Sequence, residues 1–119
     1  MRFYHLPMLM LAASVPASLA AAAELTFELR IERGSVPPNM RLIRVKQGDL
    51  VRLQWRTDRR TAVHLHGYDI ETTIEPGAVA EMTFTARATG RFTVAPHVGK
   101  TPAGGHSHGA ILVTIEVLP

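Results

Sequence analysis

The sequence contains no cysteine among its 119 residues. This absence excludes disulfide bonds, cysteine nucleophiles, iron–sulfur clusters and thiolate metal sites. Small exported domains often gain stability from disulfides, and this chain has none to use. Its stability must therefore come from the apolar core, with or without help from a bound metal ion.

The sequence also lacks a large excess of charge of one sign. It carries 13 Lys and Arg against 10 Asp and Glu, and the basic residues cluster only at 56–60. A nucleic-acid interface would interleave basic and aromatic residues on one face. The aromatic residues instead fall on alternating positions that are expected to face a core, namely Phe27, Trp55, Phe84 and Phe92. We therefore expect no nucleic-acid partner and interpret the arginines as a solvated surface.

Long hydrophobic runs are absent except at the N-terminus. Residues 1–23 have the pattern of a secretory signal peptide, with a basic start, an apolar run over 6–19 and small residues after it. The apolar run is interrupted by prolines and is shorter than the roughly 20 residues that span a membrane. Cleavage is expected after Ala20 or after Ala23, which leaves no stable membrane anchor and a periplasmic or secreted chain.

Residues 24–119 remain, enough for one small domain with a single core. Apolar and polar residues alternate with period two in short segments, which is typical of half-buried strands. These segments cover 25–32, 43–46, 51–56, 63–66, 70–74, 81–87, 91–95 and 111–117. The pattern predicts an all-β fold, an antiparallel β-sandwich of about seven or eight strands with almost no helix. Segments 43–46 and 51–56 are expected to form a hairpin.

Histidine, a common metal ligand, is concentrated in one part of the sequence. The chain has six histidines, and five of them fall between 64 and 108. In a strand His64 and His66 would share one face with Cα atoms roughly 7 Å apart, so both side chains could reach one metal ion. His97 follows, and His106 and His108 lie in a glycine-rich segment that predicts a flexible loop. A single histidine is commonly solvated, but this cluster of five predicts a metal site.

The order of several motifs resembles the cupredoxin (plastocyanin-like) family of small exported β-sandwiches, which hold copper between loops at one end. The chain has, in the family's order, Gly48-Asp49, His64, Pro76-Gly77, Gly90-Arg91-Phe92 and a ligand loop over 94–108. The resemblance covers nearly the whole of 24–119. It implies a Greek-key sandwich and a copper site.

The sequence departs from the family's blue-copper pattern at the ligand loop. The run that corresponds to the family's Cys-x-Pro-His is Val94-Ala95-Pro96-His97, so His97 matches the ligand histidine and Val94 stands in place of the thiolate. Without a thiolate the site cannot be blue copper. Further histidines are expected to replace the lost ligands, which gives the predicted metal ligands His64, His66, His97, His106 and His108. Copper is the expected metal and zinc the second choice, since copper(II) heads the affinity order for nitrogen ligands.

These features predict an exported copper-binding protein with a histidine-rich, non-blue site that binds, buffers or transfers copper in the periplasm. The expected partners are the metal ion and a periplasmic copper-handling protein, and no enzyme activity is expected. Two alternatives stay open. One is a copper or zinc enzyme or redox protein with an open histidine site, in which Asp69 or Glu71 would serve as acid or base. The other is a metal-free β-sandwich interaction domain.

Overall fold

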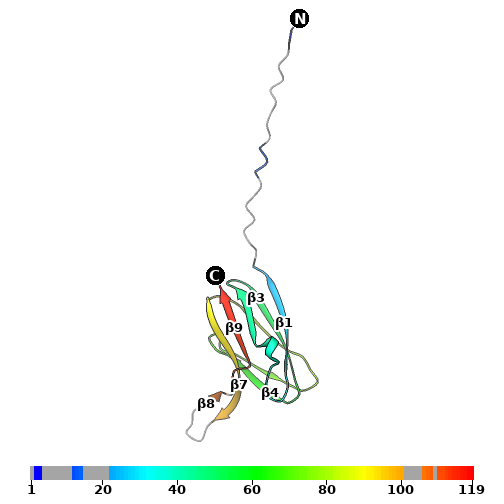
Figure 1. Ribbon diagram of the computed structural model, residues 1–119, viewed down its shortest axis with the longest axis vertical. Coiled ribbons are helices and arrows are strands. Elements are labelled where there is room, and N and C mark those ends of the chain that lie inside the picture. The colour runs from blue at the N-terminus through cyan, green and yellow to red at the C-terminus, as the bar shows by residue number, and fades with distance from the viewer. Residues whose placement is uncertain (1, 4–11, 15–21, 101–105, 109) are drawn as a thin grey trace.

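Two β-sheets pack face to face in the computed structural model (Figure 1). The structure describes residues 2–3, 12–14, 22–100, 106–108 and 110–119, and of 98–100 and 106–108 it describes the backbone only. Within these residues the only helix is the short 3-10 helix η1 (Pro38–Met40), and no helix there could cross a membrane. The all-β sandwich expected from the period-two pattern is confirmed.

The sheets differ in size. The smaller sheet has the order β1 (Glu24–Ile31), β3 (Leu50–Thr57) and β6 (Ala80–Thr85). The larger sheet has the order β2 (Leu42–Lys46), β9 (Val113–Leu118), β7 (Gly90–Lys100), β4 (Thr61–Leu65) and β5 (Ile70–Ile74), with β8 (His106–His108) paired to β7 alone. Strand β1 runs parallel to β3 and β2 runs parallel to β9, whereas the other pairs are antiparallel, so both sheets are mixed.

The core lies between the two sheets. Alternate residues of β3 point into it, and Val51, Leu53 and Trp55 are completely buried. Met82 and Phe84 of the neighbouring strand β6 lie beside Leu53 and Val51 on the same inner face, which confirms that Met82 fills the core. Because this period-two burial continues in the larger sheet, side chains on the opposite faces of its strands remain available for a site.

The predicted hairpin of 43–46 and 51–56 is wrong. Strand β2 pairs with β9 and strand β3 pairs with β1, so the turn at Gly48-Asp49 carries the chain from one sheet to the other. Alternation of apolar and polar residues fixes which face of a strand is buried, but it does not say whether the next strand returns to the same sheet.

The strand directions define two ends of the sandwich. Strands β1, β3, β5 and β7 finish at one end, and β2, β4, β6 and β9 begin there. The β7–β8 pair projects from this end, which we call the hairpin end (Figure 1). At the other end lie the start of β1 and the C-terminus (Figure 1), and we call it the terminal end. The Gly48-Asp49 turn lies there too, since Gln47 N donates to the carbonyl of Leu118 and Leu50 N donates to that of Ala23.

Candidate metal centre

Strand β4 carries the first predicted ligand, and the turn after it carries the second. Val63 and Leu65 are completely buried in the core, while His64 and His66 are partly exposed on the opposite face. The rings of the two histidines meet edge to face, with centroids 4.6 Å apart and planes at 88°. The expectation that the two histidines share one face is therefore confirmed.

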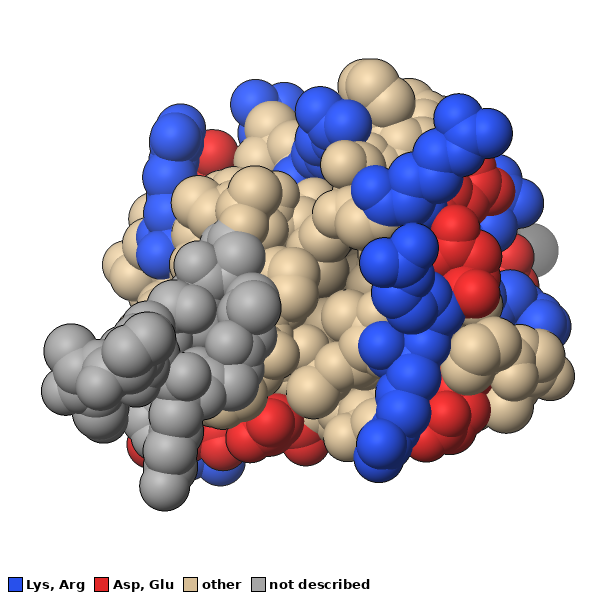
Figure 2. Space-filling model, turned by 90° about the horizontal axis from the view of Figure 1, so that it is seen from below, with Lys and Arg blue, Asp and Glu red and all other residues tan. Residues whose placement is uncertain are grey.

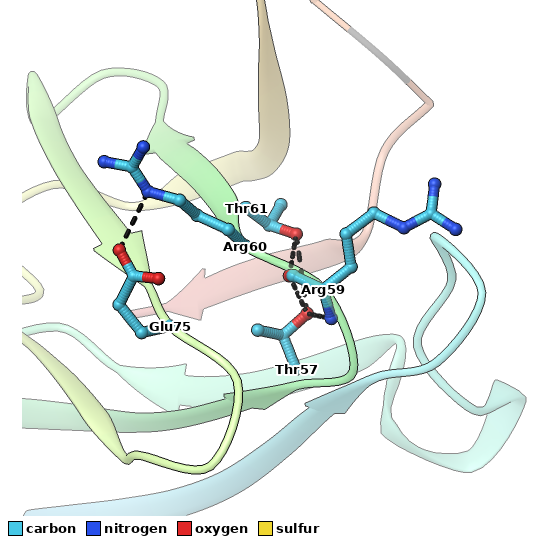
Figure 3. Close-up of polar contacts among 5 residues, drawn as sticks. All are labelled: Thr57, Arg59, Arg60, Thr61 and Glu75. Carbon is cyan, nitrogen blue, oxygen red and sulfur yellow. Dashed lines mark hydrogen bonds and ion pairs between the residues drawn. The ribbon is translucent and has the colours of Figure 1, made fainter.

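The loop that leads into β4 is held by a small polar network (Figure 3). The hydroxyls of Thr57 and Thr61 both donate to the carbonyl oxygen of Arg59, at 2.6 and 2.7 Å. Arg60 then donates from Nε to Glu75 Oε1 at 2.8 Å, which ties the loop to the end of β5. These contacts fix the residue at which β4 begins, and so they set which side chains of β4 face outward.

The turn after β4 is packed tightly against the aromatic part of the core. His66 N donates to the carbonyl of Thr93 on β7 at 2.9 Å. Gly67 has φ +91°, and a Cβ atom there would lie 2.6 Å from Cδ1 of Phe92, so only glycine fits. The Tyr68 ring packs against Phe84 and Phe92, with centroids 4.9 and 5.0 Å apart. The turn is therefore anchored on both sides, and it brings the chain back toward His64.

Asp69 ends this turn beside His64. Its Oδ1 lies 3.4 Å from His64 Nε2, and the Asp69 side chain is fully exposed, whereas that of His64 is 20% exposed. Asp69 has a positive φ of 53°, a conformation that asparagine and aspartate tolerate better than most residues. A carboxylate at this distance favours a proton on Nε2, so that Nδ1 carries the lone pair.

Strand β7 brings the third predicted ligand next to β4. The two strands are antiparallel, with His64 opposite Ala95 and Leu65 opposite Val94. Val94, which stands where blue-copper members of the family have the thiolate, is completely buried beside the histidine strand. His97 is partly exposed and two residues beyond Ala95, so it shares the face of Ala95 and is a diagonal neighbour of His64.

The last two predicted ligands lie on β8. This segment was expected to be a flexible loop, but its backbone forms a short strand antiparallel to β7. His108 is the backbone partner of His97 and His106 that of Lys100, with an irregularity between the two pairs. The expectation that the His106 and His108 side chains ligate a metal ion lies outside the described residues, since only the backbone is described there.

The histidine pair fits a metal ion as part of a ligand set. Two imidazoles on one ion through bonds of about 2.0 Å put their ring centres roughly 3.2 Å from it, so centres about 4.5 Å apart imply a near right angle at the metal. The observed 4.6 Å between the His64 and His66 rings is close to this distance, and it is also the distance of two rings in ordinary edge-to-face contact, so ring spacing alone assigns no metal. Among the side chains that the structure describes, no three His, Asp or Glu residues gather as a metal site. A complete site would therefore need further donors.

Charge around the hairpin end is mainly positive. Figure 2 shows this end from below, where basic side chains form a continuous band beside an uncharged area. Arg60 is paired with Glu75 and Arg30 with Glu32, at 2.8 Å in both pairs. Arg59, also at this end, makes no ion pair with any residue that the structure describes. The positive band provides no metal ligands, and it favours the approach of negatively charged molecules.

Comparison of the sequence with protein-family models gives no match, and neither does comparison with curated proteins. The structure is similar to several solved structures. One is a blue copper oxidase from Nitrosomonas europaea, with 21% identity and a TM-score of 0.57 over 77% of this chain and 43% of that chain. Another is the periplasmic domain of subunit II of cytochrome oxidase from Bradyrhizobium japonicum, with 16% identity and a TM-score of 0.58 over 79% and 83%. A third is a copper binding protein in the apo form, with 15% identity and a TM-score of 0.53 over 77% and 87%.

These similarities concern the fold. The chain spans less than half of the blue copper oxidase chain but most of the subunit II domain and of the copper binding protein. It therefore corresponds to one domain of the larger protein and to nearly all of the smaller ones.

Proposed function

We propose that this chain, whose fold is cupredoxin-like, is an exported copper-binding protein with a histidine-rich, non-blue site. In this proposal copper is the cargo, which the protein binds, buffers or transfers in the periplasm. Structural neighbours that are described as a copper binding protein and as a periplasmic domain support the proposal at the level of the fold.

The observation that carries the proposal is the contact between the rings of His64 and His66, on the face of β4 that points away from the core. The chain has no thiolate to offer at this place, because it contains no cysteine. Imidazole nitrogen is then the strongest donor available for copper, with zinc as the second choice. The spacing of the two rings agrees with binding to a single ion.

The remaining donors in the proposed site are His97, His106 and His108. The register between β7 and β8 makes His108 the backbone partner of His97, which in turn is a diagonal neighbour of His64 on the sheet. The backbone of β8 therefore lies beside the part of β7 that carries His97. Asp69 lies beside Nε2 of His64 and favours the tautomer in which Nδ1 is the nitrogen that would bind the metal.

A metal analysis of the exported protein tests this function. The full chain is expressed with its own leader and purified from the periplasm without an affinity tag, since a histidine tag would itself bind copper. We expect copper to bind each folded chain and to give only weak ligand-field absorption. An intense blue or green colour, or failure to bind copper, would contradict the proposal, and the second result would favour the metal-free interaction domain.

A double variant provides the specificity control for the same measurement. His64→Ala with His66→Ala removes both rings of the contact pair and should abolish tight copper binding. Glu81→Gln changes an exposed charge on β6, in the other sheet, and should leave copper binding unchanged. Equal copper affinity in the two variants would mean that the copper is bound elsewhere.

A further inference from the structure

A buried carboxylate lies at the terminal end of the sandwich, away from the histidines. Asp49 is only 6% exposed. Its Oδ2 accepts a hydrogen bond from the backbone N of Lys46 at 2.9 Å, as expected for a residue that closes a turn. Its Oδ1 accepts a hydrogen bond from the backbone N of Ala23 at 3.1 Å, which joins two segments that are 26 residues apart. The carboxylate therefore links the Gly48-Asp49 turn to the start of the folded chain.

Ala23 is held on its other side as well. Its carbonyl oxygen accepts the backbone N–H of Leu50 at 2.9 Å, and Leu50 is the register partner of Glu24. The parallel pairing of β1 with β3 thus begins with the backbone of Ala23. The turn itself is fixed to the end of β6, because Gly48 N donates to the carbonyl of Ala86 at 2.7 Å. Ala23 is consequently part of the sheet structure and not of a separate leader.

This arrangement distinguishes the two cleavage positions that the sequence allows. Cleavage after Ala23 would remove the donor to a buried carboxylate oxygen and the acceptor for the Leu50 N–H. A buried polar group that loses its partner destabilises the fold, and more so when it is charged. Cleavage after Ala20 keeps both hydrogen bonds within the mature chain.

We propose that the signal peptide is removed after Ala20, at the run Ser18-Leu19-Ala20, and that Asp49 anchors the new N-terminal segment through Ala23. This inference rests on the proposed export of the protein. It gives the Gly48-Asp49 motif a role that is separate from the metal centre, since the two lie toward opposite ends of the sandwich.

The intact mass of the protein recovered from the periplasm tests the cleavage position. The full chain with its own leader is expressed in a Gram-negative host, and the expected mass is that of residues 21–119. The mass of residues 24–119 would overturn the inference and leave the proposed export and copper binding standing. An uncleaved chain retained in the cytoplasm would overturn the proposed export, and the cleavage inference with it.

Amide hydrogen exchange on the exported protein tests the anchoring role. Asp49→Ala should speed exchange at the amides of Ala23 and Leu50 by about tenfold or more, because the first loses its acceptor and the second loses an ordered partner. Asp58→Ala is the matched control, since Asp58 also accepts a backbone N–H, from Arg33 at 2.9 Å, but at the hairpin end. Unchanged exchange at Ala23 in Asp49→Ala would overturn the anchoring role. If Asp49→Ala does not accumulate, Asp49→Asn replaces it. The asparagine side chain has only one acceptor oxygen, so the backbone amide of either Ala23 or Lys46 should still exchange faster.

Discussion

The rings of His64 and His66 lie edge to face, 4.6 Å apart between centroids. They come from one strand end and from the turn that follows it, and that turn fits only because Gly67 lies against Phe92. A local feature of the backbone therefore determines whether two imidazoles can reach one ion.

Single histidine variants should rank the ligands. His64→Ala, His66→Ala and His97→Ala are each expected to weaken copper binding by about tenfold or more while the sandwich stays folded, because each removes an imidazole donor from an exposed face. His106→Ala and His108→Ala should each weaken it less. Competition titrations with a chelator of known affinity provide the measurement. A larger loss in the His106→Ala, His108→Ala double variant than in the strand variants would place the site on β8.

A cysteine at the thiolate position should leave the optical spectrum unchanged. Val94 is completely buried and lies opposite Leu65, so its side chain points into the core, on the face opposite to that of His64. Val94→Cys introduces a small side chain that an apolar core tolerates. With copper held by His64 and His97 on the other face, the sulfur cannot reach the ion, and no intense sulfur-to-copper charge-transfer band should appear. Such a band in the folded, copper-loaded variant would show that copper is held on the inner face beside Val94.

Gly67→Ala should destabilise the protein and disturb the site together. The added Cβ would lie 2.6 Å from Phe92, at a positive φ of 91°. We expect a loss of about 2–4 kcal/mol in the free energy of unfolding. Gly48→Ala is the matched control, because Gly48 also has a positive φ but has nothing within 4 Å of the added Cβ. It should cost only about 1–2 kcal/mol. Equal losses in denaturant unfolding would show that the contact with Phe92 is unimportant.

Asp69→Asn should affect metal binding more than stability. The Asp69 carboxylate is 3.4 Å from His64 Nε2 but fully exposed, so its removal should change stability little. Replacement of the carboxylate by a neutral, weaker acceptor should weaken copper binding several-fold, at or below the lower end of the roughly 10–100-fold effects seen for such partners. Glu81→Gln is the control, since it removes the same charge from an exposed position on β6, in the other sheet. Equal effects of the two variants would assign the change to net charge.

Much of the fold could be predicted from the sequence, because one face of the strands whose side chains the structure describes is mostly buried. The alternation in 51–56 corresponds directly to the burial of Val51, Leu53 and Trp55. The same argument placed His64 and His66 on one face. The pairing of strands could not be derived in this way, since a period of two does not identify the neighbouring strand. That is why the crossing turn at Gly48-Asp49 was interpreted as a hairpin.

Other features of the site depend on contacts between residues far apart in the chain. The approach of Asp69 to His64 requires a positive φ at both Gly67 and Asp69. The link from Asp49 to Ala23 spans 26 residues. The pairing of β8 with β7 involves a glycine-rich segment whose composition favours a loop. Local patterns carry no information on these contacts, so only the structure shows them.

The central claim is that histidines assembled by the fold bind copper, and the melting temperature measured with and without copper tests it most directly. The unfolded chain cannot assemble ligands from β4 and β7, so copper should stabilise the native state. Protons compete for imidazole nitrogen, so the stabilisation should fade on acidification. We expect a clear rise in melting temperature with copper at pH of about 7.5, a much smaller rise at pH of about 5, and none at either pH for the His64→Ala, His66→Ala, His97→Ala variant. A rise that is the same at both pH values, or that persists in the triple variant, would contradict the account.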